Sequence, residues 1–238
     1  MKNYKNITGK LLTTICAVCL LSLLLTSCVK QNKIVPPPTA LLSFTQASPD
    51  EPAIDFYLDN GKVNPLPLNF GDHSDYFNAY VGARTAYFNN YDTKSTILAA
   101  PITLNQGTAY SMFLVNKATM PEVLLITDTL NKPESLHASI RFINLSPDAA
   151  AVDLALEGGS VLVTNKAFKE VSSFVSIPAK TDNTFVVREK GTGNVLATLA
   201  HVDMADGTLY TIWFHGLAGG TSTTDKLGVH IITNAAFY

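Results

Sequence analysis

The sequence has little charge and almost no cysteine. Charged residues make up 15% of its 238 positions and the formal net charge is −2, whereas about 25% is usual for a globular protein. No excess of basic residues creates the electrostatic footprint of a nucleic-acid-binding protein, so we expect no nucleic acid partner. Apolar residues make up 47% of the chain, enough to form a packed core, which excludes a disordered chain.

Cysteine is almost confined to an apolar segment near the N-terminus. Of three cysteines, Cys16 and Cys19 lie inside that segment, and Cys28 follows it. If the segment is removed, a single thiol stays behind, which excludes an internal disulfide framework and a thiolate metal cluster.

Catalytic and cofactor motifs are also missing. The five histidines, His73, His137, His201, His215 and His230, follow no metal-ligand spacing, and no glycine-rich phosphate loop opens a helix. Asp72-His73-Ser74-Asp75 is the densest cluster of polar groups, and we interpret it as a solvated loop between strands. We therefore predict that the protein is not an enzyme and that it has no catalytic residue, cofactor or metal ion.

The N-terminal segment is typical of an export signal. Three lysines among the first ten residues precede a nearly continuous apolar run, Leu11 to Leu25. A run of 15 residues is shorter than the roughly 20 that a membrane-spanning helix needs, and it matches the apolar region of a signal peptide.

The end of this signal resembles the bacterial lipobox. Leu25-Thr26-Ser27-Cys28 has an aliphatic residue, two small residues and then cysteine. The resemblance implies a lipoprotein signal peptide over residues 1–27 and acylation of Cys28, which anchors the protein to the membrane through its lipid. Residues 28–40, with three consecutive prolines, are predicted to form a stiff lipidated tether.

The residue after the lipidation site indicates in which membrane of the cell envelope the protein is anchored. Position 29 is valine, not the aspartate that resembles an inner-membrane retention signal, so an outer-membrane lipoprotein of the cell envelope is favoured. Acidic residues that resemble a surface-export signal are missing after Cys28. The sequence leaves open whether the protein faces the periplasm or the exterior.

The rest of the chain contains two copies of one pattern. Ser48-Pro49-Asp50 recurs 98 positions later as Ser146-Pro147-Asp148, and Phe70 recurs as Phe168. After two inserted residues the offset becomes 100, where Phe113 corresponds to Trp213. So many matches in order indicate an internal duplication. We predict domains over residues 41–130 and 137–238, joined by an exposed linker at 129–138.

Within each copy, apolar and polar residues alternate. Ile54, Phe56 and Leu58 alternate with polar side chains, as Val152 and Leu154 do in the second copy, which indicates half-buried strands. About seven short strands per copy, separated by turn residues, predict two tandem immunoglobulin-like β-sandwiches. We expect the second copy to fold alone around a core that includes Trp213.

The repeated motif resembles a known family. A Ser-Pro-Asp element followed by an Ile/Val-Asp-Phe/Leu strand, present twice behind a lipobox, is similar to the domain of unknown function 4397. The resemblance covers about residues 41–238 and implies a sandwich fold in cell-envelope proteins. It implies no activity and no catalytic residues.

Ser-Pro-Asp itself reads as a turn. Neither copy has a histidine nearby, so the serine lacks the base that a nucleophile needs. Serine, proline and aspartate instead suit a type I turn whose side-chain oxygens cap free backbone N–H groups. Asp55 and Asp153 follow between core positions, and we expect each of them to bond to the preceding turn.

Two functions compete at this stage. The first is a non-catalytic structural, adhesive or interaction module whose partner is another envelope protein. The second is a glycan-binding lipoprotein of a carbohydrate-uptake system. For the second, the candidate ligand-binding residues are Tyr87, Asn89, Asn90 and Tyr91, because a hairpin turn that presents tyrosine rings and amide groups suits sugar rings and hydroxyls. The second copy lacks these groups, so we expect it not to bind the same ligand.

Overall fold

The computed structural model describes residues 36–238, and this part of the chain is all-β, as predicted. It holds sixteen strands and no helix, so none of its elements is a helix able to cross a membrane. The predicted signal peptide, Cys28 and most of the tether lie outside the described residues.

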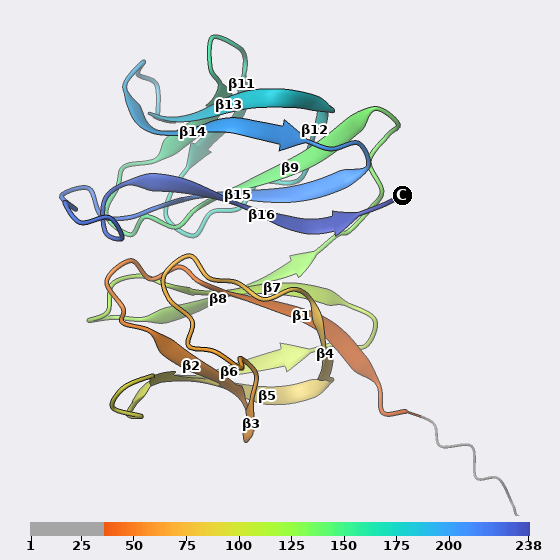
Figure 1. The fold of residues 1–238 in the computed structure, drawn as a ribbon, viewed down its shortest axis with the longest axis vertical. Helices are drawn as coiled ribbons and strands as arrows, with labels where there is room; N and C mark the ends of the chain where they lie inside the picture. The colour runs from red at the N-terminus through yellow and green to blue at the C-terminus, as the bar shows by residue number, and fades with distance from the viewer. Residues whose placement is uncertain (1–35) are drawn as a thin grey trace, which may run out of the picture. The chain divides into compact units, whose positions relative to one another are not determined.

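The first repeat is a sandwich of two four-stranded sheets (Figure 1). One sheet has the order β4-β1-β7-β8, with β1 and β7 parallel, and the other has the order β3-β2-β5-β6. The strands are β1 (Thr39–Gln46), β2 (Ile54–Leu58), β3 (Gly61–Lys62), β4 (Phe77–Tyr80), β5 (Gly82–Asn90), β6 (Thr96–Leu104), β7 (Ala109–Val115) and β8 (Glu122–Asp128).

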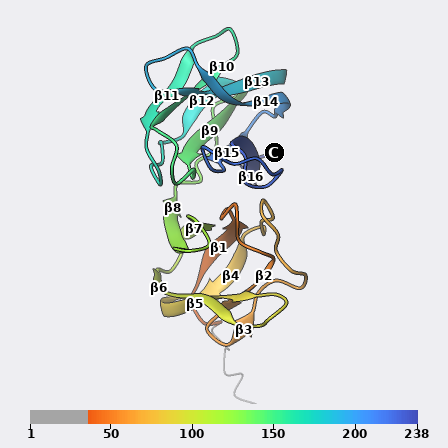
Figure 2. The ribbon, with the colours of Figure 1, turned by 90° about the vertical axis from the view of Figure 1, so that its left-hand side faces the viewer.

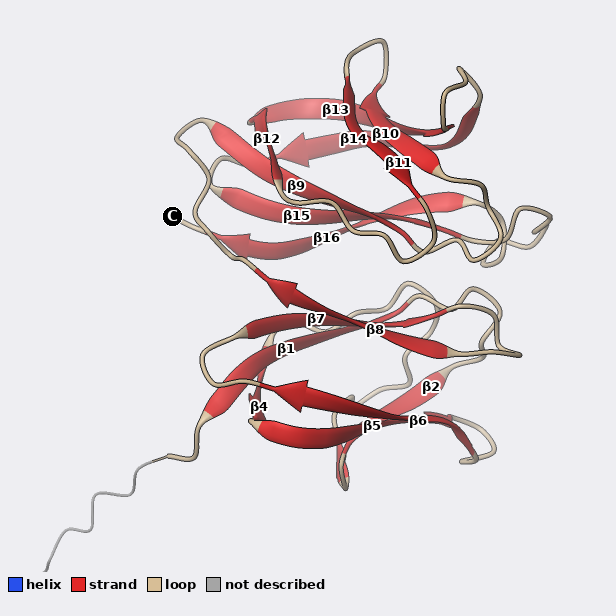
Figure 3. Ribbon diagram, turned by 180° about the vertical axis from the view of Figure 1, so that it is seen from behind, coloured by secondary structure: helices blue, strands red, loops and turns tan. Residues whose placement is uncertain are grey.

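The second repeat has the same topology, with sheets β12-β9-β15-β16 and β11-β10-β13-β14 (Figure 3). Its strands are β9 (His137–Asn144), β10 (Val152–Leu156), β11 (Val161–Lys166), β12 (Val175–Pro178), β13 (Lys180–Glu189), β14 (Val195–Met204), β15 (Thr208–His215) and β16 (Gly228–Ala236). The parallel pairing of β1 with β7 recurs between β9 and β15. The duplication seen in the sequence is therefore a duplication of the fold.

The predicted alternation places one side of each strand in a core. In the first repeat, the rings of Phe44, Phe56 and Phe88 stack with centroids 4.7 to 5.4 Å apart, and each is at most 1% exposed. In the second repeat, Phe142 and Leu154 are fully buried in the corresponding cluster. Burial of this kind contributes about 1.5–3 kcal/mol for each large apolar side chain.

A third apolar cluster joins the two repeats. Its members come from β7, β8, β9, β15 and β16 and from loops of both repeats, and residues Pro38–Tyr238 form one compact unit. The fully or almost fully buried side chains are Ala47, Phe113, Val115, Ile143, Leu145 and Trp213. Figure 1 shows the two sheets that supply them next to each other. The linker between β8 and β9 is exposed at several positions, but the surfaces it connects are packed together.

This cluster corrects the expectation for Trp213. Tyr210, Ile212 and Phe214 on β15 point into the core of the second repeat, whereas Trp213, 0% exposed, lies in the cluster between the repeats. The reason is the period of two along a strand, which sends neighbouring side chains to opposite faces of the sheet. One face of the sheet β12-β9-β15-β16 packs on the core of the second repeat and the other on the first repeat. Residues on both faces are therefore apolar, and the sequence alone does not show which of them face the other repeat.

Candidate functional site

Three tyrosines lie on the outer surface of the sheet β3-β2-β5-β6. Tyr57 on β2 and Tyr87 on β5 are directly opposed in the register of the two strands. Tyr91 begins the turn after β5, where its backbone N–H donates to the carbonyl of Ala53 at 2.9 Å. We call Tyr57, Tyr87 and Tyr91 the tyrosine face; its sheet is on the side of the first repeat away from the second (Figure 2).

Strand alternation directs these rings outward. Phe56 and Phe88, the neighbours of Tyr57 and Tyr87, are fully buried in the core, so the tyrosines point to the other side of the sheet. Side chains at directly opposed positions have Cβ atoms about 4.5–5.5 Å apart, which places the two rings side by side. Tyr91 is 37% exposed, and the other two are half-buried.

A charged clamp lies among the rings. Asp55 is on the same side of the sheet, yet it is only 2% exposed because two lysines cover it. Lys62 Nζ is 2.7 Å from one carboxylate oxygen and Lys94 Nζ is 3.2 Å from the other. Burial on its own raises the pKa of Asp55, but the hydrogen bonds and charges of the two lysines outweigh it and hold that pKa below its ordinary value.

The clamp also positions the aromatic groups. Lys94 Nζ lies 4.1 Å from the centroid of the Tyr91 ring, a cation–π contact. Lys62 is opposed to Tyr57 in the register of β2 and β3, and its hydrogen bond to Asp55 raises its pKa. One carboxylate thus fixes two lysines, each of which is close to a tyrosine. The face is held in place before any ligand arrives.

The structure places the four predicted residues in different roles. Tyr87 and Tyr91 belong to the tyrosine face, and Asn89 is opposed to Asp55 on the same side of the sheet. Asn89 Oδ1 is buried and has no hydrogen-bond partner in residues 36–238. Asn90 is different, because its Oδ1 accepts the backbone N–H groups of the next turn, from Asp92 and Thr93, at 2.9 Å each. Its side-chain oxygen stabilises the hairpin.

Sequence reasoning missed Tyr57. The alternation along Ile54–Leu58 already indicated that Tyr57 points away from the core. Its place beside Tyr87 follows only from the pairing of β2 with β5, two strands nearly thirty positions apart in the chain.

The second repeat has no tyrosine face. In its register Ala155 is opposed to Val186, and both are buried, at 0% and 2% exposure. The backbone N–H of Lys190 donates to the carbonyl of Ala151 at 3.0 Å, the counterpart of the Tyr91 bond to Ala53. Lysine therefore stands where the first repeat has Tyr91. The backbone is the same in the two repeats, and the rings are present in only one.

The two Ser-Pro-Asp turns act as clips. Ser48 Oγ donates to the carbonyl of Asn116 at 2.6 Å, and Ser146 Oγ donates to that of Gly216 at 2.7 Å. Asp50 Oδ1 accepts the backbone N–H of Ala118, and Asp148 Oδ1 accepts that of Ala218, both at 2.8 Å. The predicted capping by aspartate is confirmed, and each serine donates to a carbonyl instead of accepting an N–H.

The expected bond from Asp55 and Asp153 to the preceding turn is wrong. Asp55 bonds to the two lysines described above, and Asp153 Oδ1 accepts the backbone N–H of Asn165 at 2.6 Å. These partners lie after the aspartates in the chain. Lys62 and Asn165 are on the next strand, which pairs with the strand of the aspartate, and Lys94 is in the turn after β5, which also pairs with β2.

A buried ion pair links the repeats. Arg141 on β9 pairs with Asp128 on β8, with side chains only 3% and 0% exposed. Arg141 also donates from Nε to Thr211 Oγ1 at 2.7 Å and from a terminal nitrogen to Ser111 Oγ at 2.8 Å. Tyr76 Oη donates to Asp128 at 2.6 Å. The charges are thus both paired and hydrogen-bonded, as buried charges must be.

No group of three metal-ligating side chains suited to an ion occurs among residues 36–238. The densest polar cluster of the sequence serves the fold instead. Asp72 Oδ2 accepts the backbone N–H of Asn69 at 2.8 Å, and Ser74 Oγ accepts that of Phe44 at 2.9 Å. Asp72 thus fixes a turn within the loop before β4, and Ser74 holds that loop against β1.

Residues 40–155 match the domain of unknown function DUF4397. The match covers the first repeat from the second residue of β1 and extends into β10 of the second repeat, whereas the sequence motif predicted a similarity over about residues 41–238. No curated protein matches the chain.

The chain is also similar to two solved structures. One is the crystal structure of CBMbc, a family CBM26 module of Eubacterium rectale Amy13K in complex with maltoheptaose, with 9% identity and a TM-score of 0.27 over 83% of this chain and 97% of that one. The other is described as alpha-glucan binding by a streptococcal virulence factor, with 12% identity and a TM-score of 0.25 over 75% and 92% of the two chains.

Proposed function

We propose that this protein is a non-catalytic, lipid-anchored module of the bacterial cell envelope whose first repeat binds glycans on the tyrosine face. The observation that carries the proposal is the contrast between the repeats. Tyr57 and Tyr87 are opposed on an outer surface of the first, and buried Ala155 and Val186 take their places in the second. The first repeat thus presents two partly exposed rings at positions that the second repeat buries.

The chemistry of the face suits sugar rings. A tyrosine presents a flat apolar surface at low entropic cost, and its hydroxyl exchanges hydrogen bonds with sugar hydroxyls. The lysines near Asp55 supply further donors, because each ammonium has three and the carboxylate uses one from each.

The anchor rests on the sequence. Cys28 follows a lipobox-like triplet and is the last cysteine of the chain. Acylation there, at about 0.8 kcal/mol for each buried methylene, would hold the protein on the outer membrane. Fatty-acid labelling of the wild type and of Cys28→Ser tests this: we expect label only in the wild type, and label that persists in the variant would remove the anchor from the proposal.

The glycan function is tested by exchanging the residues of the repeats. A double variant, Tyr57→Ala with Tyr87→Val, gives the first repeat the side chains of the second. On a glycan array the chain from residue 29 onward should bind, and the double variant and Tyr91→Ala should bind at least tenfold more weakly. Tyr80→Ala is the matched control, because Tyr80 is 58% exposed but lies on β4, in the other sheet.

Thermal unfolding of each variant separates lost binding from lost folding. The proposal fails if the wild type binds no glycan, or if the double variant binds as the wild type does while both are folded.

A structural role is the second candidate. The buried pair Arg141–Asp128 and the apolar cluster around Trp213 fix one repeat on the other, as an adhesive or spacer module that contacts another envelope protein requires. Cross-linking in intact cells distinguishes the two: a single protein partner that is retained by the Tyr57→Ala, Tyr87→Val chain favours the structural role.

A further inference from the structure

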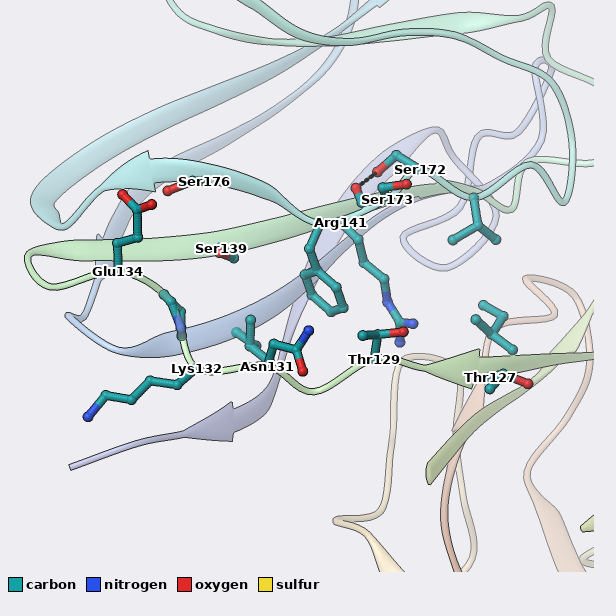
Figure 4. A pocket seen from close by; sticks show the side chains of 15 residues that line it. Thr127, Thr129, Asn131, Lys132, Glu134, Ser139, Arg141, Ser172, Ser173 and Ser176 are labelled. Atoms are coloured by element: carbon teal, nitrogen blue, oxygen red, sulfur yellow. Dashed lines mark hydrogen bonds between the residues drawn. The ribbon is translucent and has the colours of Figure 1, made fainter. Parts of the chain in front are cut away.

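A cavity of about 700 Å³ opens where the linker between the repeats passes β9 and the segment that leads into β12 (Figure 4). It is lined by parts of the chain that the tyrosine face does not include. Thr127 belongs to β8, Thr129 and Asn131 to the linker, Ser139 to β9, Ser173 to the segment before β12, and Ser176 to β12 itself. Segments of both repeats therefore build it.

The lining offers five hydroxyl groups and one amide group to a ligand. Within residues 36–238 none of the six polar side chains just named has a hydrogen-bond partner, although each lines the cavity. The neighbouring Ser172 differs, because its Oγ accepts from the N–H of Phe142 and donates to the carbonyl of Ser173. These groups come from three separate stretches of chain, 127–131, 139 and 173–176, and line one space.

A buried cation forms one wall. Arg141 lines the cavity, and its side chain is 3% exposed. Three of its five N–H donors are used, by Thr211, Ser111 and Asp128. The Phe174 ring, with its centroid 5.3 Å from the guanidinium carbon, also lines the cavity. Figure 4 shows Arg141 and Thr129 close together on one side, and Glu134 with Ser176 on the other.

The charges around the cavity balance. Asp128 pairs with Arg141, and the two other charged groups of the lining, Lys132 and Glu134, have opposite signs. A strongly anionic or cationic ligand gains no net attraction here. Hydroxyl and amide groups of both hydrogen-bonding types, with one aromatic ring, suit a neutral ligand that carries many hydroxyls and an apolar face.

We propose that this cavity, the junction pocket, is a second binding site, and that it takes one or two rings of a neutral saccharide. Its volume falls within the range of roughly 300–1,000 Å³ that is usual for small-ligand sites. The proposal shares its ligand class with the proposed function but not its residues, so either site can fail while the other stands.

The test is an NMR titration of the chain from residue 29 onward, labelled with ¹⁵N. The probes are maltose, cellobiose, lactose and N,N′-diacetylchitobiose, with glycylglycine as a zwitterion of similar size. We expect at least one disaccharide to shift the amide signals of Thr129, Ser173 and Phe174 in a saturable way.

Variants that fill the pocket provide the second measurement. Ser173→Trp should weaken the saturable shifts at least tenfold, whereas Ser160→Trp, an exposed serine beside β11, should leave them unchanged. Tyr91→Ala should also leave them unchanged, which separates this site from the tyrosine face.

Three outcomes would overturn the proposal. The first is that no disaccharide shifts the signals of the lining in the wild type, a result that does not depend on how any variant folds. The second is that shifts occur only on the tyrosine face, which would leave the proposed function intact. The third is that glycylglycine binds and the sugars do not, which would show that the ligand class is wrong.

Discussion

The ring of Phe70, from the loop before β4, meets the ring of Trp213, from β15, edge to face across the two repeats, with centroids 5.9 Å apart and planes at 73°. Phe168, the counterpart of Phe70, and Phe113, the counterpart of Trp213, lie in the same cluster. Equivalent surfaces of the two copies are thus buried against each other, as in a symmetric dimer made from one chain.

We therefore expect the only tryptophan to report the interface. Phe70→Ala, a change in the first repeat, should alter Trp213 emission in the second and lower the midpoint of thermal unfolding, because it removes packing from the shared cluster. Leu66→Ala is the control, since Leu66 is in the same loop but 74% exposed. Unchanged emission in folded Phe70→Ala would contradict the contact.

The buried ion pair should matter far more than an exposed one. Asp128→Ala leaves Arg141 charged and buried, and we expect it to lower the free energy of unfolding by about 3–5 kcal/mol. Lys169→Ala removes a second pair between the repeats, with Glu122, whose side chains are 38% and 40% exposed, and should cost less than about 1 kcal/mol. Denaturant unfolding measures both, and equal costs would be the contrary result.

The contacts between the repeats could not be predicted from the sequence, whereas much of the fold within each repeat could. The duplication, the all-β class and the core positions follow from residue order and a period of two, which are local properties. Phe113 and Trp213 were recognised as counterparts, but the sequence could not show that both face the other repeat. Whether a face meets solvent, its own partner sheet or a second domain depends on tertiary packing.

The candidate sites show the same limit. Tyr87 and Tyr91 could be found from composition, whereas Tyr57 joins them only through strand register. The two-residue strand β3, which carries Lys62, is too short to give a pattern and was not predicted. The junction pocket could not be predicted from the sequence, because its walls come from segments that are far apart in the chain and that carry no alternating pattern of apolar and polar residues.

Acid should weaken the interface through a histidine. His215 is 4% exposed and lies beside His230, with ring centroids 4.6 Å apart. Burial, with a smaller contribution from the charge of His230, lowers the pKa of His215 to about 3. The unfolded chain takes up a proton near pH 6.5 and the folded protein does not, so stability falls as the pH drops from 6.5 toward 3.

The check is His215→Val, which introduces the residue that the first repeat has at this place, Val115. The difference in unfolding free energy between wild type and variant should change by about 2–3 kcal/mol between pH 7.5 and pH 4.5, the wild type losing more in acid. If this difference in unfolding free energy stays constant between pH 7.5 and pH 4.5, His215 is protonated in the folded state as readily as in the unfolded chain, and burial does not lower its pKa.

Glu51, next to the first Ser-Pro-Asp turn, should act in the opposite direction. It is 9% exposed, and burial, together with the nearby charge of Asp50, raises its pKa to about 7. Between pH 4.5 and 7 the folded protein therefore binds a proton that the unfolded chain has released, so this group makes stability fall as the pH rises.

Glu51→Gln keeps the shape of the side chain and cannot ionise. We expect the variant to match the wild type near pH 4 and to be more stable by about 2–3 kcal/mol at pH 8. Thermal and denaturant unfolding at both pH values measure this gain. Glu157→Gln in the second repeat and Glu134→Gln in the linker, both at exposed glutamates, are controls that should show none. A gain of equal size at pH 4 and pH 8 would show that the effect comes from packing, because only a carboxylate that ionises late can make it depend on pH.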